Sequence, residues 1–234
     1  MSEDRDQPAA PIAFADPSYA TGVVDLLGVL AYGELTAFER LAEDAAMAPT
    51  TADKAALAAM ASAEFGHFTA LRDRLEKLDV DPYAAMAPFS DSFDRFHAHT
   101  APADWLESLV KAYVGDGLAA DFYREVAAFL DADTRDLIMT TLDDTGHSAF
   151  VVDRVRRAIA DDPTIGGRLA LWGRRLVGEA LSQAQVVVAE HDGLSAVLTG
   201  SVDRPGMDLA AIGRMFARLT ENHAARMASL GLAS

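Results

Sequence analysis

The sequence contains no cysteine among its 234 residues. Disulfides, thiolate metal sites and cysteine nucleophiles are therefore excluded. Basic residues are also few, because 20 lysines and arginines stand against 36 aspartates and glutamates, and the formal net charge is −16. Such a charge opposes attraction to nucleic acid or to an anionic membrane. The basic residues gather in "DRVRRAI" (153–159) and "GRLALWGRRLVGE" (167–179), which predict either a solvated helix surface or a local basic face.

Long apolar runs and a leader pattern are missing as well. No stretch approaches the roughly 18 uninterrupted apolar residues that span a bilayer, so we expect no membrane partner. The first residues, "MSEDRDQPAAP", are acidic and rich in Pro and Ala, unlike the basic and then apolar regions of a secretory signal. We expect residues 1–15 to form a disordered acidic tail, residues 16–234 to form a single domain, and the protein to be cytoplasmic.

β-Branched runs bounded by turn residues are scarce, whereas alanine and leucine are abundant. This composition favours an all-α protein. Breaking residues divide the chain into six expected helices, at about 18–46, 52–78, 103–130, 135–160, 163–190 and 209–231. A long connection over 79–102 separates the first two helices from the next two. This order predicts a ferritin-like four-helix bundle with one long crossover, on which two additional C-terminal helices pack.

The second and fourth expected helices place an acid and a histidine within the apolar stripe. In "AEFGHF" (63–68) the helical repeat assigns Glu64 and His67 to the face that would be buried. They are three residues apart, so both project from one side of the helix. "DDTGH" (143–147) repeats the arrangement with Asp144 and His147.

The first and third expected helices each carry one acid in the same stripe. Glu34 lies in the stripe of "AYGELTAF", whereas Glu39 falls on the wet side. Asp116 lies in the stripe of the similar segment "AYVGDGLAADF", whereas Asp121 falls outside it. The chain therefore repeats a pair of helices, one with a single acid and one with an acid and a histidine.

Four inward carboxylates and two histidines would be very unfavourable without cations, because a buried charge must be compensated. Two divalent metals would neutralise four carboxylates, and each could take one imidazole. This composition is that of a di-iron or di-manganese carboxylate site in a helical bundle. The aspartates are shorter than glutamates, so their helices must come closer or the second metal binds more weakly. The predicted metal ligands are Glu34, Glu64, His67, Asp116, Asp144 and His147.

The segments "YGELTAF", "AEFGHF", "PADWLESLVKAYVGDGLAADFYREVA" and "DDTGH" resemble the ferritin-like superfamily. Within it they resemble the branch of tRNA 2-methylthio-N6-isopentenyladenosine hydroxylase-like (MiaE-like) proteins. The resemblance implies two non-haem irons, with O2 as co-substrate, that hydroxylate an unactivated C–H bond. It implies that Glu34, Glu64 and His67 hold one iron, and that the second acidic group and its histidine hold the other. An electron-donor protein and tRNA are the implied partners.

Two other functions stay open at this point. The chain could be a ferritin-like protein that oxidises or stores iron, or an interaction protein of the same fold that binds no metal. A homodimer is expected in each case, with the C-terminal helices as the interface. Tyr113 and Tyr123 share the face of Asp116 and are expected to pack in the core. His97 and His223 are expected to lie at the surface.

Overall fold

The computed structural model describes residues 16–141, 147–200 and 206–233, except for the side chain of His147. The predicted tail over residues 1–15 lies outside this range. The described residues form helices and short connections without a strand, which confirms the all-α prediction.

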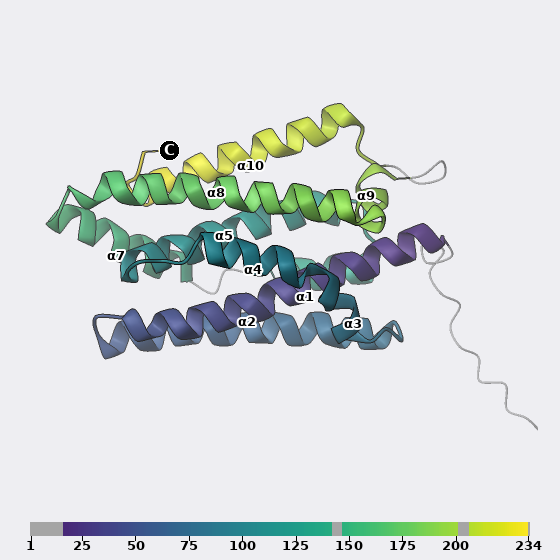
Figure 1. Cartoon of the computed structure of the whole chain (residues 1–234), viewed down its shortest axis with the longest axis horizontal. Helices are drawn as coiled ribbons and strands as arrows, with labels where there is room; N and C mark the ends of the chain where they lie inside the picture. Colours follow the sequence, from purple (N-terminus) through teal and green to yellow (C-terminus); the bar gives the residue numbers. More distant parts are fainter. Residues whose placement is uncertain (1–15, 142–146, 201–205, 234) are drawn as a thin grey trace, which may run out of the picture.

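Helices α1 (Pro17–Asp44) and α2 (Thr51–Lys77) form the first pair, joined through the 3-10 turn η2 (Ala45–Met47). They lie along one side of the bundle (Figure 1). Asp16 caps α1, because its side chain accepts hydrogen bonds from the first backbone N–H groups of the helix. The hydroxyl of Thr50 likewise accepts a hydrogen bond from the backbone N–H of Asp53 at the start of α2. Both helices therefore begin within one residue of the predicted positions.

The connection over residues 79–102 is itself largely helical, which the prediction missed. It contains α3 (Pro82–Met86), the 3-10 turn η3 (Ala87–Phe89) and α4 (Ser90–His99). The side chain of Asp81 caps α3, and Pro82 occupies its first turn, so a local signal was present. α4 packs against both α1 and α8. The crossover is thus a helical layer of the molecule.

The second pair begins with α5 (Trp105–Ala127), which lies between the α1–α2 pair and the C-terminal helices (Figure 1). The helix predicted over 135–160 corresponds to α6 (Ala132–Thr141) and α7 (His147–Asp161). The C-terminal additions are α8 (Ile165–Glu190), α9 (Asp192–Thr199) and α10 (Leu209–Ser229), so α9 is an element that the sequence did not predict. Gly231 follows α10 with a φ of 78°, as expected for a glycine at a helix end.

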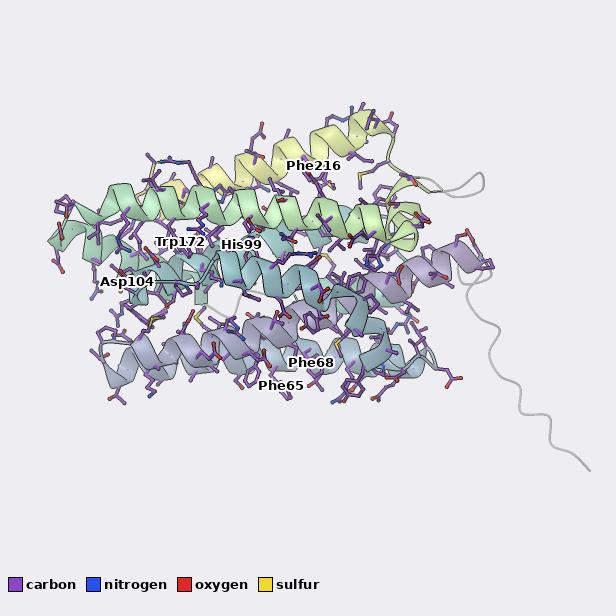
Figure 2. The ribbon with its side chains drawn as sticks, viewed as in Figure 1. Phe65, Phe68, His99, Asp104, Trp172 and Phe216 are labelled. Atoms are coloured by element: carbon purple, nitrogen blue, oxygen red, sulfur yellow. The ribbon has the colours of Figure 1, made fainter. Side chains whose placement is uncertain are left out.

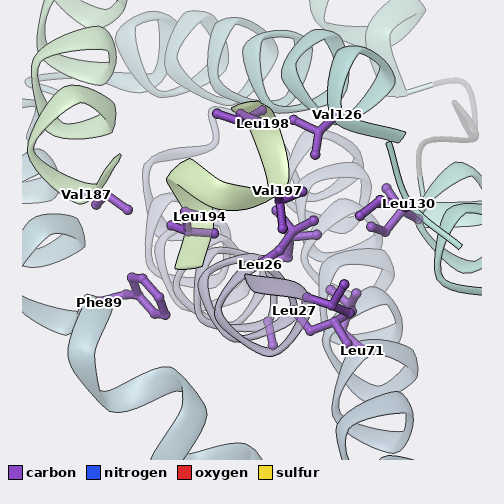
Figure 3. Close-up of a cluster of buried hydrophobic side chains, with 14 of the residues drawn as sticks. Leu26, Leu27, Leu71, Phe89, Val126, Leu130, Val187, Leu194, Val197 and Leu198 are labelled. Atoms are coloured by element: carbon purple, nitrogen blue, oxygen red, sulfur yellow. The ribbon is translucent and has the colours of Figure 1, made fainter. Parts of the chain in front are cut away.

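Two hydrophobic clusters fill the bundle. The first surrounds Leu27 and Leu71 and includes residues of α5 and α9 (Figure 3). The second contains buried residues of the α2, α5, α7 and α8 helices. On α1 the buried residues of the first cluster end at Ala31 and those of the second begin at Leu41. On α2 the second ends at Ala61 and the first resumes at Phe68, so both helices carry a gap at the same level.

By length and composition alone, the helical stretch Pro17–Met47 could cross a membrane. Its most apolar residues pack inside the bundle, where Leu26, Leu27 and Leu30 are buried in the first cluster. A core helix of a bundle meets the same test, and this packing accounts for the apolar character of α1.

Candidate metal centre

Glu34 of α1 and Glu64 and His67 of α2 come together in the gap between the two hydrophobic clusters. One ligand atom from each lies within 4.8 Å of the other two. The Nδ1 atom of His67 is 3.5 Å from a carboxylate oxygen of Glu34 and 3.3 Å from one of Glu64. The two glutamate side chains are 12% and 13% exposed, and the imidazole is 24% exposed. The site is therefore mostly, though not completely, withdrawn from solvent.

Helical phase explains how the three side chains meet. Glu64 and His67 are three residues apart on α2, so they stand on one face of that helix. α1 packs along the length of α2 and presents Glu34 at the same level. Glu39, five residues further along α1, is 52% exposed and belongs to the opposite face, as predicted.

The carboxyl groups and the imidazole perturb one another strongly. Burial raises the pKa of Glu34, the hydrogen bond with His67 lowers it, and the neighbouring Glu64 raises it further. Hydrogen bonds from Glu34 and Glu64 raise the pKa of His67 to about 10, although burial opposes this change. Two acids that cannot both ionise freely therefore hold a protonated imidazole between them.

These three groups fit a divalent cation. Carboxylate oxygen and imidazole nitrogen are ligands that suit iron and manganese. A cation with two positive charges would compensate both carboxylates and displace the proton from the imidazole. The donor set, its burial and its mutual distances thus satisfy what a metal site requires.

Asp116 of α5 lies near this group but is exposed, whereas the sequence predicted an inward side chain. The charges of Glu34, Glu64 and Asp116 all raise the pKa of Tyr123, after the larger effect of its burial. The three acids therefore act on one phenol of α5, which places Asp116 on the side of that helix that faces α1 and α2. Tyr123 packs against the first hydrophobic cluster, as expected.

The remaining two predicted ligands are not described. Asp144 and the side chain of His147 lie outside the described residues, and the backbone of His147 begins α7. Among the described residues, the structure thus brings three of the predicted ligands together and sets Asp116 on the neighbouring helix.

Aromatic rings line the outer side of the site. Phe65, which follows Glu64, lies with its ring centroid 5.2 Å from that of Phe38 on α1 and 5.5 Å from that of Phe68. Figure 2 shows Phe65 and Phe68 on α2. Phe68 is buried, whereas Phe65 is 43% exposed. An apolar wall therefore runs from the surface of α2 to the level of the candidate ligands.

Two histidines predicted at the surface have other environments. His97 of α4 lies with its Nδ1 atom 3.2 Å from Nζ of Lys111, whose ammonium group also donates a hydrogen bond to the carbonyl of Thr100. His223 is 4% exposed and sits on α10, which packs on α5 and α8. Neither segment shows a strong apolar stripe around the histidine, so the sequence carried little signal of burial.

Residues 17–201 match the family model described as "Ferritin-like domain, actinomycetes". The chain belongs to this family. The ferritin-like match covers the bundle and all six predicted ligands, and it ends before α10. The ferritin-like chain is also similar to a solved structure, "Protein 19 with aldehyde deformylating oxidase activity from Synechococcus". The two are 20% identical, with a TM-score of 0.68 over 94% of each chain, a likeness that shows the fold. No curated protein matches the sequence.

Proposed function

We propose that this ferritin-like protein is an O2-dependent oxidase with two iron ions, held by Glu34, Glu64, His67, Asp116, Asp144 and His147. The observation that carries the proposal is the cluster of two buried carboxylates and one imidazole within 4.8 Å of one another. Iron bound there would supply the activation of O2, with electrons delivered by a donor protein. The fold family supports the proposal because bundles of this kind hold metals through inward acids and histidines.

The protein's own residues would contribute ligands and a dry environment. Glu34, Glu64 and His67 would hold the first metal between the two hydrophobic clusters. These clusters would limit the entry of water along the bundle on either side, which protects reactive intermediates. Phe38 and Phe65 would offer an apolar surface to a substrate approaching from the exposed side of α2.

The substrate we propose is a small or nucleotide-borne apolar group. The resemblance to MiaE-like hydroxylases favours hydroxylation of an alkyl group on a modified tRNA adenosine. The net charge of −16 argues against strong binding of intact tRNA. The similar Synechococcus protein has aldehyde deformylating oxidase activity, which makes aliphatic aldehydes the second class to test.

The test begins with the metal content per chain after expression in iron-supplemented medium. We expect close to two irons in the wild-type chain and loss of the first site in His67→Asn. The loaded protein is then reduced and mixed with O2, with and without an alkyl-modified adenosine or an aliphatic aldehyde. Substrate-dependent O2 consumption that is absent in His67→Asn would support the oxidase. A chain that takes up no iron, even after anaerobic reconstitution, would overturn it in favour of a metal-free interaction protein.

A further inference from the structure

The helices α6 and α7 are attached to α2 at two places that lie on either side of the candidate site. At the first place, the guanidinium of Arg74 on α2 lies 3.5 Å from a carboxylate oxygen of Asp131 and 3.2 Å from the hydroxyl oxygen of Thr134. Asp131 caps α6, because the same oxygen accepts a hydrogen bond from the backbone N–H of Thr134. The side chain of Asp131 is 7% exposed, so this contact is protected from solvent.

The second attachment lies at the other end of α2. Nε of Arg154 on α7 donates a hydrogen bond of 2.6 Å to the carboxylate of Asp53, whose side chain is 5% exposed. Asp53 stands in the first turn of α2 and also accepts a hydrogen bond from the hydroxyl of Thr50. The two attachments are reciprocal, since an arginine of one partner binds an aspartate at the start of the other.

The spacing of the two contacts is the same on both sides. Arg74 follows Asp53 by 21 positions on α2, and Arg154 follows Thr134 by 20 positions along α6 and α7. At the rise of an α-helix, each distance is roughly 30 Å. The order of the contacts also shows that α6 and α7 run antiparallel to α2. Glu64 lies 11 positions after Asp53 and 10 before Arg74, so it stands midway between the contacts.

We propose that Arg74 and Arg154 are positioning residues of the metal centre, an inference that rests on the proposed function. The two contacts fix the height of α6 and α7 along α2, so that the end of α6 and the start of α7 lie level with Glu64 and His67. Carboxylates of opposing helices repel one another before metal arrives, and a charged clamp at each end resists the separation. The clamp assigns a role to Arg154 in "DRVRRAI", a segment that otherwise reads as a solvated surface.

An ordinary stabilising ion pair would have a different signature from a positioning pair. Arg226 on α10 supplies the matched control, because its guanidinium lies 2.6 Å from the buried carboxylate of Asp121 on α5. This pair resembles the Arg154–Asp53 pair in distance and burial. It joins α10 to α5 and lies away from the contacts between α2 and the α6 and α7 helices.

The experiment compares Arg74→Met, Arg154→Met and Arg226→Met with the wild-type chain. Each folded protein is titrated anaerobically with Co²⁺ well below its thermal midpoint, and the number of bound equivalents and their dissociation constants are measured. We expect all three variants to lower the thermal midpoint. Arg74→Met and Arg154→Met should weaken the second equivalent at least tenfold and the first less than threefold, whereas Arg226→Met should leave both unchanged.

Milder variants keep the test decisive if a methionine variant does not fold. Arg154→Lys and Arg74→Lys retain the charge and should restore most of the affinity for the second equivalent. A wild-type chain that binds metal and variants that bind it equally well would overturn the inference alone. Equal weakening in Arg226→Met would also overturn it, because a general loss of stability would then explain the result. A wild-type chain that binds no metal would overturn the proposed function, and this inference with it.

Discussion

Glu34 and Glu39 are the same residue type on the same helix, five positions apart, with opposite surroundings. Glu34 is buried beside Glu64 and His67, whereas Glu39 is exposed. Glu34→Gln should therefore abolish binding of the first metal and raise the thermal midpoint of the metal-free protein, because one of two repelling buried acids is removed.

Glu39→Gln is the control for this prediction and should change neither property. The measurements are metal content after desalting and thermal unfolding of the metal-free proteins. Retention of full metal binding by Glu34→Gln would mean that Glu34 is not a ligand.

His97 makes a second prediction at the scale of single residues. Burial and the charges of Lys111 and Arg40 lower the pKa of His97 from 6.5 to about 3. Between these two pH values the unfolded chain binds the proton and the folded chain does not, so this histidine makes the protein less stable as the pH falls. Asp44, near Lys111, acts in the opposite direction, because burial raises its pKa to about 6.

The variant His97→Gln removes only the contribution of the histidine. The free energy of unfolding of the wild-type chain, minus that of the variant, should be constant above pH 6.5. It should fall below pH 6.5 by up to about 1.4 kcal/mol per pH unit. Urea unfolding at a series of pH values measures the difference. Parallel curves for the two proteins would show that His97 titrates normally in the folded state.

At the scale of elements, the close approach of α1 and α9 depends on glycine. A Cβ added to Gly22 of α1 would overlap the carbonyl oxygen of Gly193 and a methyl group of Val197 on α9. Gly22→Ala should therefore force the helices apart and lower the free energy of unfolding by about 1–3 kcal/mol.

Gly213 of α10 is the matched control, because a Cβ there would meet nothing within 4 Å. Gly213→Ala should raise the free energy of unfolding by up to about 1 kcal/mol, since alanine has the higher helix propensity. Denaturant unfolding of both variants tests the pair. A neutral Gly22→Ala would mean that α9 can move away from α1 without loss.

The anchoring of α5 on α8 is another property of elements. Figure 2 labels Asp104, which caps α5, and Trp172 of α8. The indole N–H of Trp172 donates a hydrogen bond to the carbonyl of Glu107, and Arg168 pairs with both Asp104 and Glu107. The helix that carries Asp116 is thus held at its start by the C-terminal addition, which connects that addition to the candidate site.

At the scale of the whole molecule, the solution mass distinguishes an oxidase from an iron store. A storage cage needs many identical bundles to assemble, whereas the proposed oxidase needs none. We expect light scattering to give twice the chain mass of 24.9 kDa. The exposed Leu171 of α8 and Leu209 of α10 offer apolar contacts for such a dimer. A mass of many chains would favour iron storage over the proposed oxidase.

The sequence by itself determined the helices, most of their boundaries and the three ligands on α1 and α2. These features follow from short-range rules, since capping, helix propensity and the 3.6-residue repeat act within a few residues. Glu64 and His67 could be paired because they lie one turn apart on one helix. Glu34 could be added because its own stripe has the same gap.

Only the tertiary structure decided which side chains meet across helices. The bonds of Arg74 to Asp131 and of Arg154 to Asp53 join residues 57 and 101 positions apart. The exposure of Asp116 and the burial of His223 likewise depend on how α5 and α10 pack on their neighbours. Helical periodicity gives the face of each residue but not the relative height of two helices. That height is set by packing and ion pairs between distant segments, and it decides whether the two halves of a metal site can meet.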